Sequence, residues 1–145
     1  MMIRTMTAED VDKAAALEAE NFSEPWSAVA FLEEIHKDTS VYMVAEEGED
    51  IVGICGIVTS FDEGEVLNVS VRKEYRDRGI AYKMLCQLLE EAYAKGIRHF
   101  TLEVREGNVA ARHLYEKLGF VCEGIRPNFY RSPVENAAIY WLHKE

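Results

Sequence analysis

Residues 65–96 constrain the fold more than any other stretch of the chain. They begin with the strand-like run EVLNVSV (65–71) and end with GIAYKMLCQLLEEAYAKG (79–96), whose apolar residues recur every three or four positions and which stops at Gly96. A strand that leads through a short loop into an amphipathic helix buries its apolar side only when helices pack on a sheet. The sequence therefore predicts an α/β protein.

The other elements follow from the same kind of pattern. Further helices are expected over 7–22 with Thr7 as N-cap, 24–37 with Ser27 as cap, and 108–119, which Asn108 caps and Gly119 ends. Strands are expected over 2–6, 41–47, 51–61, 98–104, 120–130 and 135–144, with hairpin turns at GED (48–50) and DEG (62–64). We expect one domain, 1–145, with a mixed, mostly antiparallel, twisted sheet of six to seven strands flanked by about four helices.

The length and the apolar content suit one core. A chain of 145 residues with 48% apolar residues buries about two thirds of the surface that it exposes when unfolded. No apolar run approaches the roughly 20 residues that span a bilayer, and the opening MMIRTMTAED lacks the apolar stretch of a secretory signal. We expect a soluble, cytoplasmic protein without membrane contacts.

Cysteine and histidine patterns give no sign of a disulfide framework or a metal site. Cys55, Cys86 and Cys122 are odd in number, lie far apart and form no C-x-x-C pair. The four histidines have no metal-ligand spacing. Reduced, mostly buried thiols and no metal are expected.

Charge divides the chain into two unlike halves. Residues 1–70 hold 16 Asp and Glu against 3 Lys and Arg, whereas residues 71–145 hold 10 against 13. Such asymmetry steers a cationic partner toward one side and an anionic one toward the other, although plain solubility also explains an acidic half. The basic residues form no stripe interleaved with aromatic residues, so no nucleic-acid partner is expected.

The loop before helix 79–96 has the features of an anion site. The backbone amides of Arg78 to Ala81 lie in the first helical turn, where they lack helical acceptors and the helix dipole is positive. Gly79 allows a ligand to approach the backbone, and Arg76 and Arg78 add positive charge that suits phosphate. An ordinary connection between a strand and a helix also contains such residues, so the pattern alone leaves both interpretations open.

Two motifs make the pattern specific. VSVRKEYRDRGIAYKML fits [RQ]-x-x-G-x-[GA] through Arg76, Gly79 and Ala81, and it resembles the acyl-CoA pyrophosphate loop of the GCN-five-related N-acetyltransferases (GNAT). LEVREGNVAARHLYEKLGF (102–120) is similar to a second block of that superfamily. The spacing of the blocks, the upstream PWS (25–27) and the near-complete coverage of the chain resemble the RimI-like branch, which acetylates the N-terminal alanine of a small-subunit ribosomal protein.

The chain departs mildly from the family pattern. Arg76 stands where Gln is common, Ala81 stands where Gly is common, and Pro127 follows Arg126 in the segment leading to the last strand. Proline has no amide to donate, so interrupted strand pairing is expected at Pro127.

The resemblance implies a catalytic pair. Phe100, Leu102 and Val104 share one face of strand 98–104, which places Glu103 on the other face, where it matches the family's general base. Tyr115 matches the general acid that protonates the departing thiolate. Without the family, Glu103 is equally an exposed strand residue, and Tyr115, among apolar helix neighbours, is a core aromatic.

The resemblance also implies acetyl-CoA as cosubstrate and a set of binding residues. The amide-bearing arm of the cosubstrate would pair with strand backbone, and its phosphates would meet the loop and first helical turn. Asn108, two helical turns before Tyr115, matches a further cofactor contact. The implied cofactor-binding residues are Val69, Ser70, Val71, Arg76, Asp77, Arg78, Gly79, Ile80, Ala81, Tyr82 and Asn108. Trp26 and Tyr130 match positions that flank the acceptor groove, although both have ordinary interpretations as packed aromatics.

We therefore expect an N-terminal protein acetyltransferase. A protein N-terminus has a pKa near 8 and lysine one near 10.4, so neutralising lysine costs about 3 kcal/mol more at equal pH. A basic acceptor, a ribosomal protein in the implied branch, fits the acidic N-terminal half. A small-amine (polyamine-type) acetyltransferase and a non-catalytic acyl-CoA-binding regulator remain as alternatives, and the oligomeric state stays open.

Overall fold

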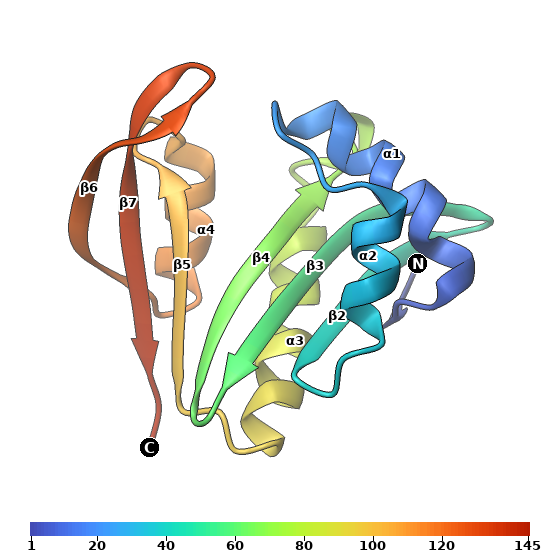
Figure 1. Cartoon of the computed structure of the whole chain (residues 1–145), viewed down its shortest axis with the longest axis horizontal. Helices are drawn as coiled ribbons and strands as arrows, with labels where there is room; N and C mark the ends of the chain where they lie inside the picture. Colours follow the sequence, from blue (N-terminus) through green and yellow to red (C-terminus); the bar gives the residue numbers. More distant parts are fainter.

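A seven-stranded sheet runs through the computed structural model, which describes residues 1–145 (Figure 1). Its strands lie in the order β1-β2-β3-β4-β5-β7-β6, and every neighbouring pair is antiparallel except the parallel pair β4 and β5. The strands are β1 (Met2–Thr5), β2 (Ser40–Glu47), β3 (Asp50–Ser60), β4 (Glu63–Val71), β5 (His99–Arg105), β6 (Val121–Arg131) and β7 (Val134–His143). The predicted mixed sheet is confirmed.

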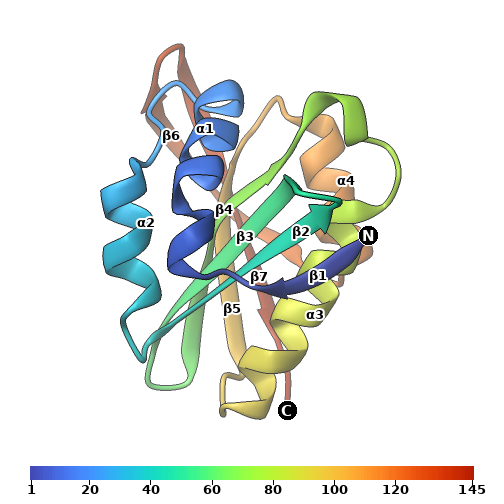
Figure 2. The ribbon, with the colours of Figure 1, turned by 90° about the vertical axis from the view of Figure 1, so that its right-hand side faces the viewer.

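Helices cover both faces of the sheet. They are α1 (Val11–Asn21), α2 (Ala28–Ile35), α3 (Ile80–Ala94) and α4 (Val109–Lys117), with short 3-10 turns at η1 (Ala8–Asp10) and η2 (Lys73–Tyr75). Figure 2 views the sheet from its β1 edge, with α1 and α2 on one side and α3 and α4 on the other. Each helix pair closes an apolar cluster against its own face of the sheet. No helix is both long enough and apolar enough to cross a bilayer.

Most predicted helix ends are confirmed by their hydrogen bonds. The Ser27 hydroxyl accepts from the Ala30 amide at 3.1 Å, and the Asn108 side-chain oxygen accepts from the Ala111 amide at 3.1 Å. After α3 and α4 the backbone turns at Gly96 and Gly119, with φ of +102° and +101°, values that glycine adopts without steric cost. These ends are fixed by local chemistry that the sequence displays.

One predicted helix start is confirmed and one predicted turn is wrong. Thr7 is the N-cap, and its amide donates to the Asp10 carboxylate at 2.8 Å in a capping box; the first turn, η1, is a 3-10 turn, and the α-helix starts at Val11. The turn expected at DEG (62–64) lies instead at Phe61 and Asp62, since Ser60 pairs with Glu63. Gly64 belongs to β4, where a Cβ atom would come within 2.5 Å of the Ile57 side chain.

The three cysteines are free, as predicted, but the expectation of mostly buried thiols is wrong. Cys55 is buried, whereas Cys86 and Cys122 are half-buried. Interrupted pairing around Pro127 is also confirmed, because the register of β6 against β7 shifts between Arg126 and Tyr130.

Candidate active site

The β4–β5 opening is the main irregularity of the sheet. The two strands pair only over Glu63–Glu65 and His99–Thr101, although β4 continues to Val71 and β5 to Arg105. Beyond these three pairs the strands diverge, as Figure 1 shows near the top of the sheet. We use the name β4–β5 opening for the space between 66–71 and 102–105. Here strand backbone lacks a neighbouring strand and is free to bind an extended ligand.

A β-bulge lies at the edge of this opening. Between the pairs Gly56 with Leu67 and Ile54 with Ser70, β3 contributes one residue and β4 contributes two, Asn68 and Val69. Asn68 has a φ of +58°, in the left-handed region that asparagine tolerates. Bulges bend a strand and increase its twist, which gives a physical reason why β4 turns away from β5 here.

The last residue of β4 directs its backbone into the opening. The Arg72 amide donates to the Val52 carbonyl at 2.8 Å, so the alternation of an antiparallel pair points the Val71 amide and carbonyl away from β3. The carbonyl accepts from the Asn21 side-chain amide at 3.1 Å and from Arg76 Nε at 3.3 Å. The Val71 amide donates to no atom of the protein and is available to a ligand.

The first turn of α3 presents free amides. The first helical bond runs from the Lys83 amide to the Gly79 carbonyl at 3.1 Å, so the amides of Gly79, Ile80, Ala81 and Tyr82 have no acceptor in the protein. Gly79 has a φ of +78°, and a Cβ atom built there would meet nothing within 4 Å. The space in front of this positive helix end is therefore open to an anion.

Arg76, Asp77 and Arg78, the charged candidates of the loop before α3, differ in their contacts. Arg76 donates through Nη2 to the Asn21 side-chain oxygen, so its guanidinium ties the loop to α1. Arg78 is exposed, with its guanidinium 4.9 Å from the centre of the Tyr75 ring. Asp77 is exposed and has a φ of +63°. Arg78 is thus the loop arginine whose charge stays unpaired near the free amides.

The two remaining loop candidates differ in burial. The Ile80 side chain is buried in the core beneath α3, which leaves only its backbone to face a ligand. Tyr82 is half-buried and lines a cavity of about 580 Å³ between α3 and α4, where Lys117 Nζ lies 4.6 Å from the centre of its ring. The candidate loop therefore leads into a groove between these two helices.

Two carboxylates face the α1 and α2 side of the sheet beside the opening. Glu103 of β5 points away from its buried neighbours Leu102 and Val104, as predicted. Glu65 pairs in register with Thr101, which puts it on the same face as Glu103. Burial and the nearby Glu103 charge raise the pKa of Glu65. Arg126 Nη1 lies 3.5 Å from the Glu103 carboxylate, so this acidic pair has one basic neighbour.

Tyr115 lies on the opposite face of the sheet. Its side chain is 7% exposed and packs in the core beneath α3 and α4, with its ring centre 6.0 Å from that of Phe120. Desolvation by burial raises the pKa of its phenol well above the usual value, so the hydroxyl remains protonated at neutral pH. Asn108, on the same helix, is exposed and uses its side-chain oxygen as the N-cap of α4.

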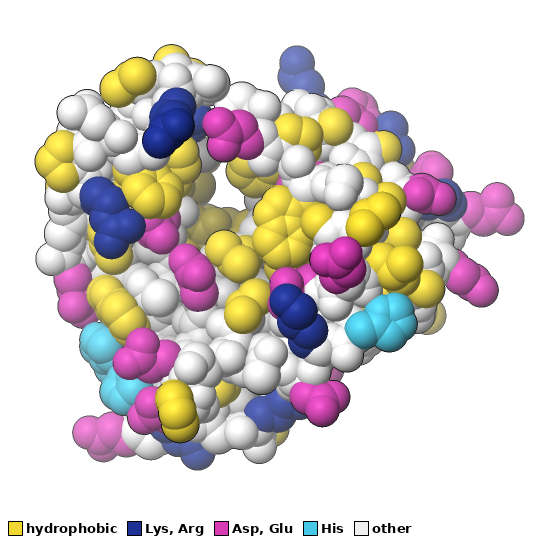
Figure 3. Space-filling model, in the orientation of Figure 1, with side chains coloured by type: hydrophobic (Ala, Val, Ile, Leu, Met, Phe, Trp, Pro, Cys, Tyr) yellow, Lys and Arg dark blue, Asp and Glu magenta, His cyan; other side chains and the backbone are white.

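The predicted acceptor contacts come from two separate elements, the α1–α2 loop and β6, which Figure 1 shows on either side of the β4–β5 opening. Trp26, in the loop between α1 and α2, is half-buried, with its ring 5.4 Å from that of Phe31. Tyr130 of β6 is half-buried beneath the Arg105 guanidinium, 4.3 Å from its ring centre. Burial and the Glu103 charge raise the pKa of Tyr130 to about 12. Figure 3 shows the hollow between these two sides, with hydrophobic and acidic side chains around it.

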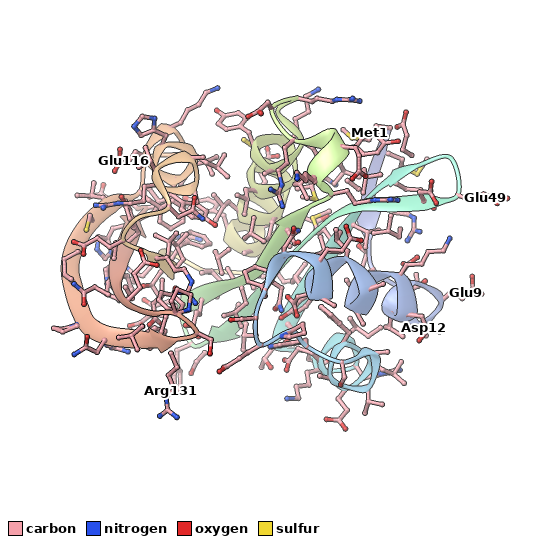
Figure 4. The ribbon with its side chains drawn as sticks, turned by 90° about the horizontal axis from the view of Figure 1, so that it is seen from above. Met1, Glu9, Asp12, Glu49, Glu116 and Arg131 are labelled. Atoms are coloured by element: carbon pink, nitrogen blue, oxygen red, sulfur yellow. The ribbon has the colours of Figure 1, made fainter.

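Figure 4 shows the same separation from above, with Arg131 of the β6–β7 hairpin and Glu116 of α4 on one side and Glu9 and Asp12 on the other. A pocket of about 390 Å³ lies over β6 and β7. Its lining residues are Glu123, Gly124, Ile125, Arg126, Pro127, Ile139 and Trp141. Because Ile139 pairs with Glu103 and Trp141 with Thr101, this pocket lies on the same face as the two carboxylates.

Sequence reasoning missed several residues of the site. Asn21 contacts the end of β4 across 50 positions of sequence. Glu18 of α1 contacts Asn68 of β4, and Arg126 of β6 contacts Glu103 of β5. Asn68 carried one usable signal, since asparagine is uncommon inside strands and tolerates positive φ. The others have no local pattern, because their partners lie far away in the sequence.

Comparisons with known proteins show the family of the chain. The model of the acetyltransferase (GNAT) family matches residues 11–120. The ribosomal protein bS18-alanine N-acetyltransferase of Haemophilus ducreyi is 31% identical over 147 residues, covering 98% of this chain and 99% of that protein. The N-alpha-acetyltransferase RimI of Mycobacterium tuberculosis is 35% identical over 149 residues, covering 99% of this chain and 91% of that protein.

A solved structure gives the same result for the fold. The crystal structure of the ribosomal-protein-S18-alanine N-acetyltransferase from Escherichia coli superposes with a TM-score of 0.88 at 27% identity, covering 98% of this chain and 92% of that one. The fold, the family model and the relatives all identify an N-acetyltransferase. The chain belongs to the GNAT family of acetyltransferases and, within it, resembles the RimI-type ribosomal-protein-alanine N-acetyltransferases.

Proposed function

We propose that this protein transfers the acetyl group of acetyl-CoA to the N-terminal α-amine of a ribosomal protein that begins with alanine. The observation that carries the proposal is the β4–β5 opening. It brings the free amides of α3, unpaired strand backbone and the Glu103 carboxylate to one place in the fold. RimI-type relatives that match nearly the whole chain are named for this reaction.

The cosubstrate would lie along the α3 and α4 side of the opening. The amides of Gly79 to Tyr82 would bind its phosphates, with Arg78 adding charge, and Asp77 would shape the loop through its positive φ. The backbone of Val69, Ser70 and Val71 would bind the amide-bearing arm as an added strand does. Arg76 would hold the end of β4 through Asn21 and the Val71 carbonyl, and Asn108 would contact the cosubstrate from the start of α4.

The acceptor amine would approach from the other face, where Glu103 lies. The neutral amine nitrogen attacks the thioester carbonyl carbon, and the C–S bond breaks as the new C–N bond forms. Glu103 takes the proton that the amine loses, directly or through a water molecule. Tyr115 gives its proton to the departing thiolate of coenzyme A, and burial keeps this phenol protonated until that step.

The acceptor side suits a cationic peptide. Glu65 and Glu103 stand beside the opening, and Glu123 lines the adjoining pocket. Trp26 and Tyr130 would flank the peptide from opposite sides of the hollow. An α-amine is also easier to neutralise than a lysine amine at equal pH. Ribosomal proteins are made in the cytoplasm, so we place the enzyme there as well.

Release of coenzyme A tests the proposal with three acceptors. They are a basic peptide beginning with alanine, the same peptide blocked at its N-terminus, and spermidine. Turnover with the free peptide alone is expected. Turnover with spermidine alone would overturn the ribosomal assignment while leaving the fold and the donor intact, and equal turnover with the blocked peptide would show that lysine is the acceptor.

A further inference from the structure

A carboxylate outside the catalytic pair is almost completely buried. Glu18 of α1 is 2% exposed and accepts two hydrogen bonds, from the Trp26 backbone amide at 2.5 Å and from the Asn68 side-chain amide at 2.6 Å. Asn68 in turn accepts from the Tyr42 hydroxyl at 2.7 Å. The Trp26 amide, the Asn68 amide nitrogen and the Tyr42 hydroxyl each donate to an acceptor in this set, so the three hydrogen bonds form one connected network.

The network joins two parts of the molecule that lie far apart in sequence. Asn68 is the bulge residue of β4 with the positive φ, directly before Val69, Ser70 and Val71. Trp26 belongs to the loop between α1 and α2, on the acceptor side. One carboxylate, that of Glu18, therefore contacts both the strand proposed for the cosubstrate and the loop proposed for the acceptor.

We propose that Glu18 is a positioning residue that holds the β4 bulge and the Trp26 loop in one fixed relation, so that both substrates meet in register. This inference rests on the proposed function. Glu18 touches neither substrate. It acts through Asn68, whose conformation directs the strand backbone, and through the Trp26 amide, which fixes the acceptor loop.

The chemistry of the site supports a positional role. An apolar side chain would fill the same buried place without the cost of burying a charge, a cost that appears as a raised pKa of Glu18 caused by desolvation. An apolar residue would leave the Trp26 amide and the Asn68 side-chain amide without acceptors. Glu18 is thus fitted to two donors that come from two different elements.

Two single variants and their combination, in which the amide and the carboxylate of positions 18 and 68 change places, test the proposal. In Asn68→Asp two carboxylates face each other, so we expect the Kd of acetyl-CoA and the KM of the peptide each to rise about tenfold. In Glu18→Gln we expect a smaller rise in Kd and KM. The Asn68 side-chain amide can rotate by 180° so that its oxygen accepts from the introduced glutamine amide, and then only the Tyr42 hydroxyl proton lacks an acceptor. Aspartate, like asparagine, tolerates the positive φ of position 68.

The double variant Glu18→Gln with Asn68→Asp restores all three hydrogen bonds of the network, and only the bond between positions 18 and 68 has its donor and acceptor reversed. The amide introduced at position 18 donates to the carboxylate introduced at position 68, which still accepts from Tyr42, and the Trp26 amide still has an acceptor. We expect its Kd and KM to return to within about threefold of the original protein, better than either single variant. Glu20→Gln, an exposed change on the same helix, is the matched control and should have no effect.

All constants are measured at a temperature where circular dichroism shows each variant folded. Single variants that lower only the melting temperature, with Kd and KM unchanged, would overturn the proposal and leave Glu18 a purely structural residue. A double variant no better than Glu18→Gln would do the same, and this comparison stands even if Asn68→Asp fails to fold. The Kd of acetyl-CoA needs no acceptor, so it decides the matter even if the peptide proves to be the wrong substrate.

Discussion

The Glu103 carboxylate on β5 lies 3.5 Å from the Arg126 guanidinium on the edge strand β6. Strand β7 lies between these two strands in the sheet, so the contact crosses it on the α1 and α2 face, which is the proposed acceptor face. The Arg126 side chain is 59% exposed, and an ion pair this open contributes about 0 to 1 kcal/mol to stability. Because this basic neighbour is easily displaced, the ion pair leaves Glu103 free for the general-base role proposed above.

Glu103→Gln should lower kcat by about 100-fold or more, because an amide cannot take the amine proton. The Kd of acetyl-CoA should not change, since Glu103 lies on the acceptor face of the sheet. Steady-state kinetics with the alanine peptide and calorimetry with acetyl-CoA measure the two quantities. Glu9→Gln, an exposed change before α1, serves as the control, and an equal loss in that variant would refute a specific role for Glu103.

Tyr115→Phe should lower kcat by about tenfold or more while acetyl-CoA still binds. The ring keeps its packing against Phe120, and only the hydroxyl group that would supply the proton is lost. Tyr140→Phe is a matched control in the same core, because that hydroxyl bonds to Glu116 and Arg112 and has no proposed part in the chemistry. If binding of acetyl-CoA in Tyr115→Phe weakened as much as turnover, a mainly chemical role for this phenol would be excluded.

Gly79→Trp should abolish acetyl-CoA binding, because the side chain would fill the open space before the free amides of α3. Gly79→Ala isolates the backbone effect and should cost about 1 kcal/mol of stability through its positive φ. Gly96→Ala at the other end of α3 has a similar φ and equally open space, so it should cost similar stability and leave the Kd unchanged. Equal losses of affinity at positions 79 and 96 would argue against a ligand at the start of α3.

Stability should fall as the pH rises above about 10. Burial raises the pKa of Tyr42 and Tyr115, so in that range the unfolded chain releases phenol protons that the folded chain keeps. The stabilisation is complete below the unfolded pKa near 10 and declines above it, by up to about 1.4 kcal/mol per pH unit for each such tyrosine. Urea unfolding between pH 8.5 and 11.5 should therefore show a shallower decline for Tyr115→Phe. Identical slopes would mean that this phenol ionises in the folded state.

Much of the fold was readable from the sequence because its signals are local. Caps such as Ser27 and Asn108 bond to amides three positions away, and the alternation around Glu103 follows from strand geometry alone. The motif around Gly79 likewise occupies a few consecutive residues. The boundary that was wrong, at DEG (62–64), depends on the pairing of Ser60 with Glu63 and on the close approach of Gly64 to Ile57, which the presence of turn residues does not reveal.

The site itself shows the same division between local pattern and tertiary contact. The sequence by itself determined the order of the elements and the free helix end at Gly79, and its resemblance to the family singled out Glu103 and Tyr115 as candidates. Only the tertiary structure decided that β4 leaves β5 after Glu65, that Asn68 forms the bulge, and that these candidates stand on opposite faces of the opening. The physical reason is that strand pairing and buried hydrogen bonds join residues tens of positions apart, such as Glu18 and Asn68, and no local pattern encodes which distant partner each group will find.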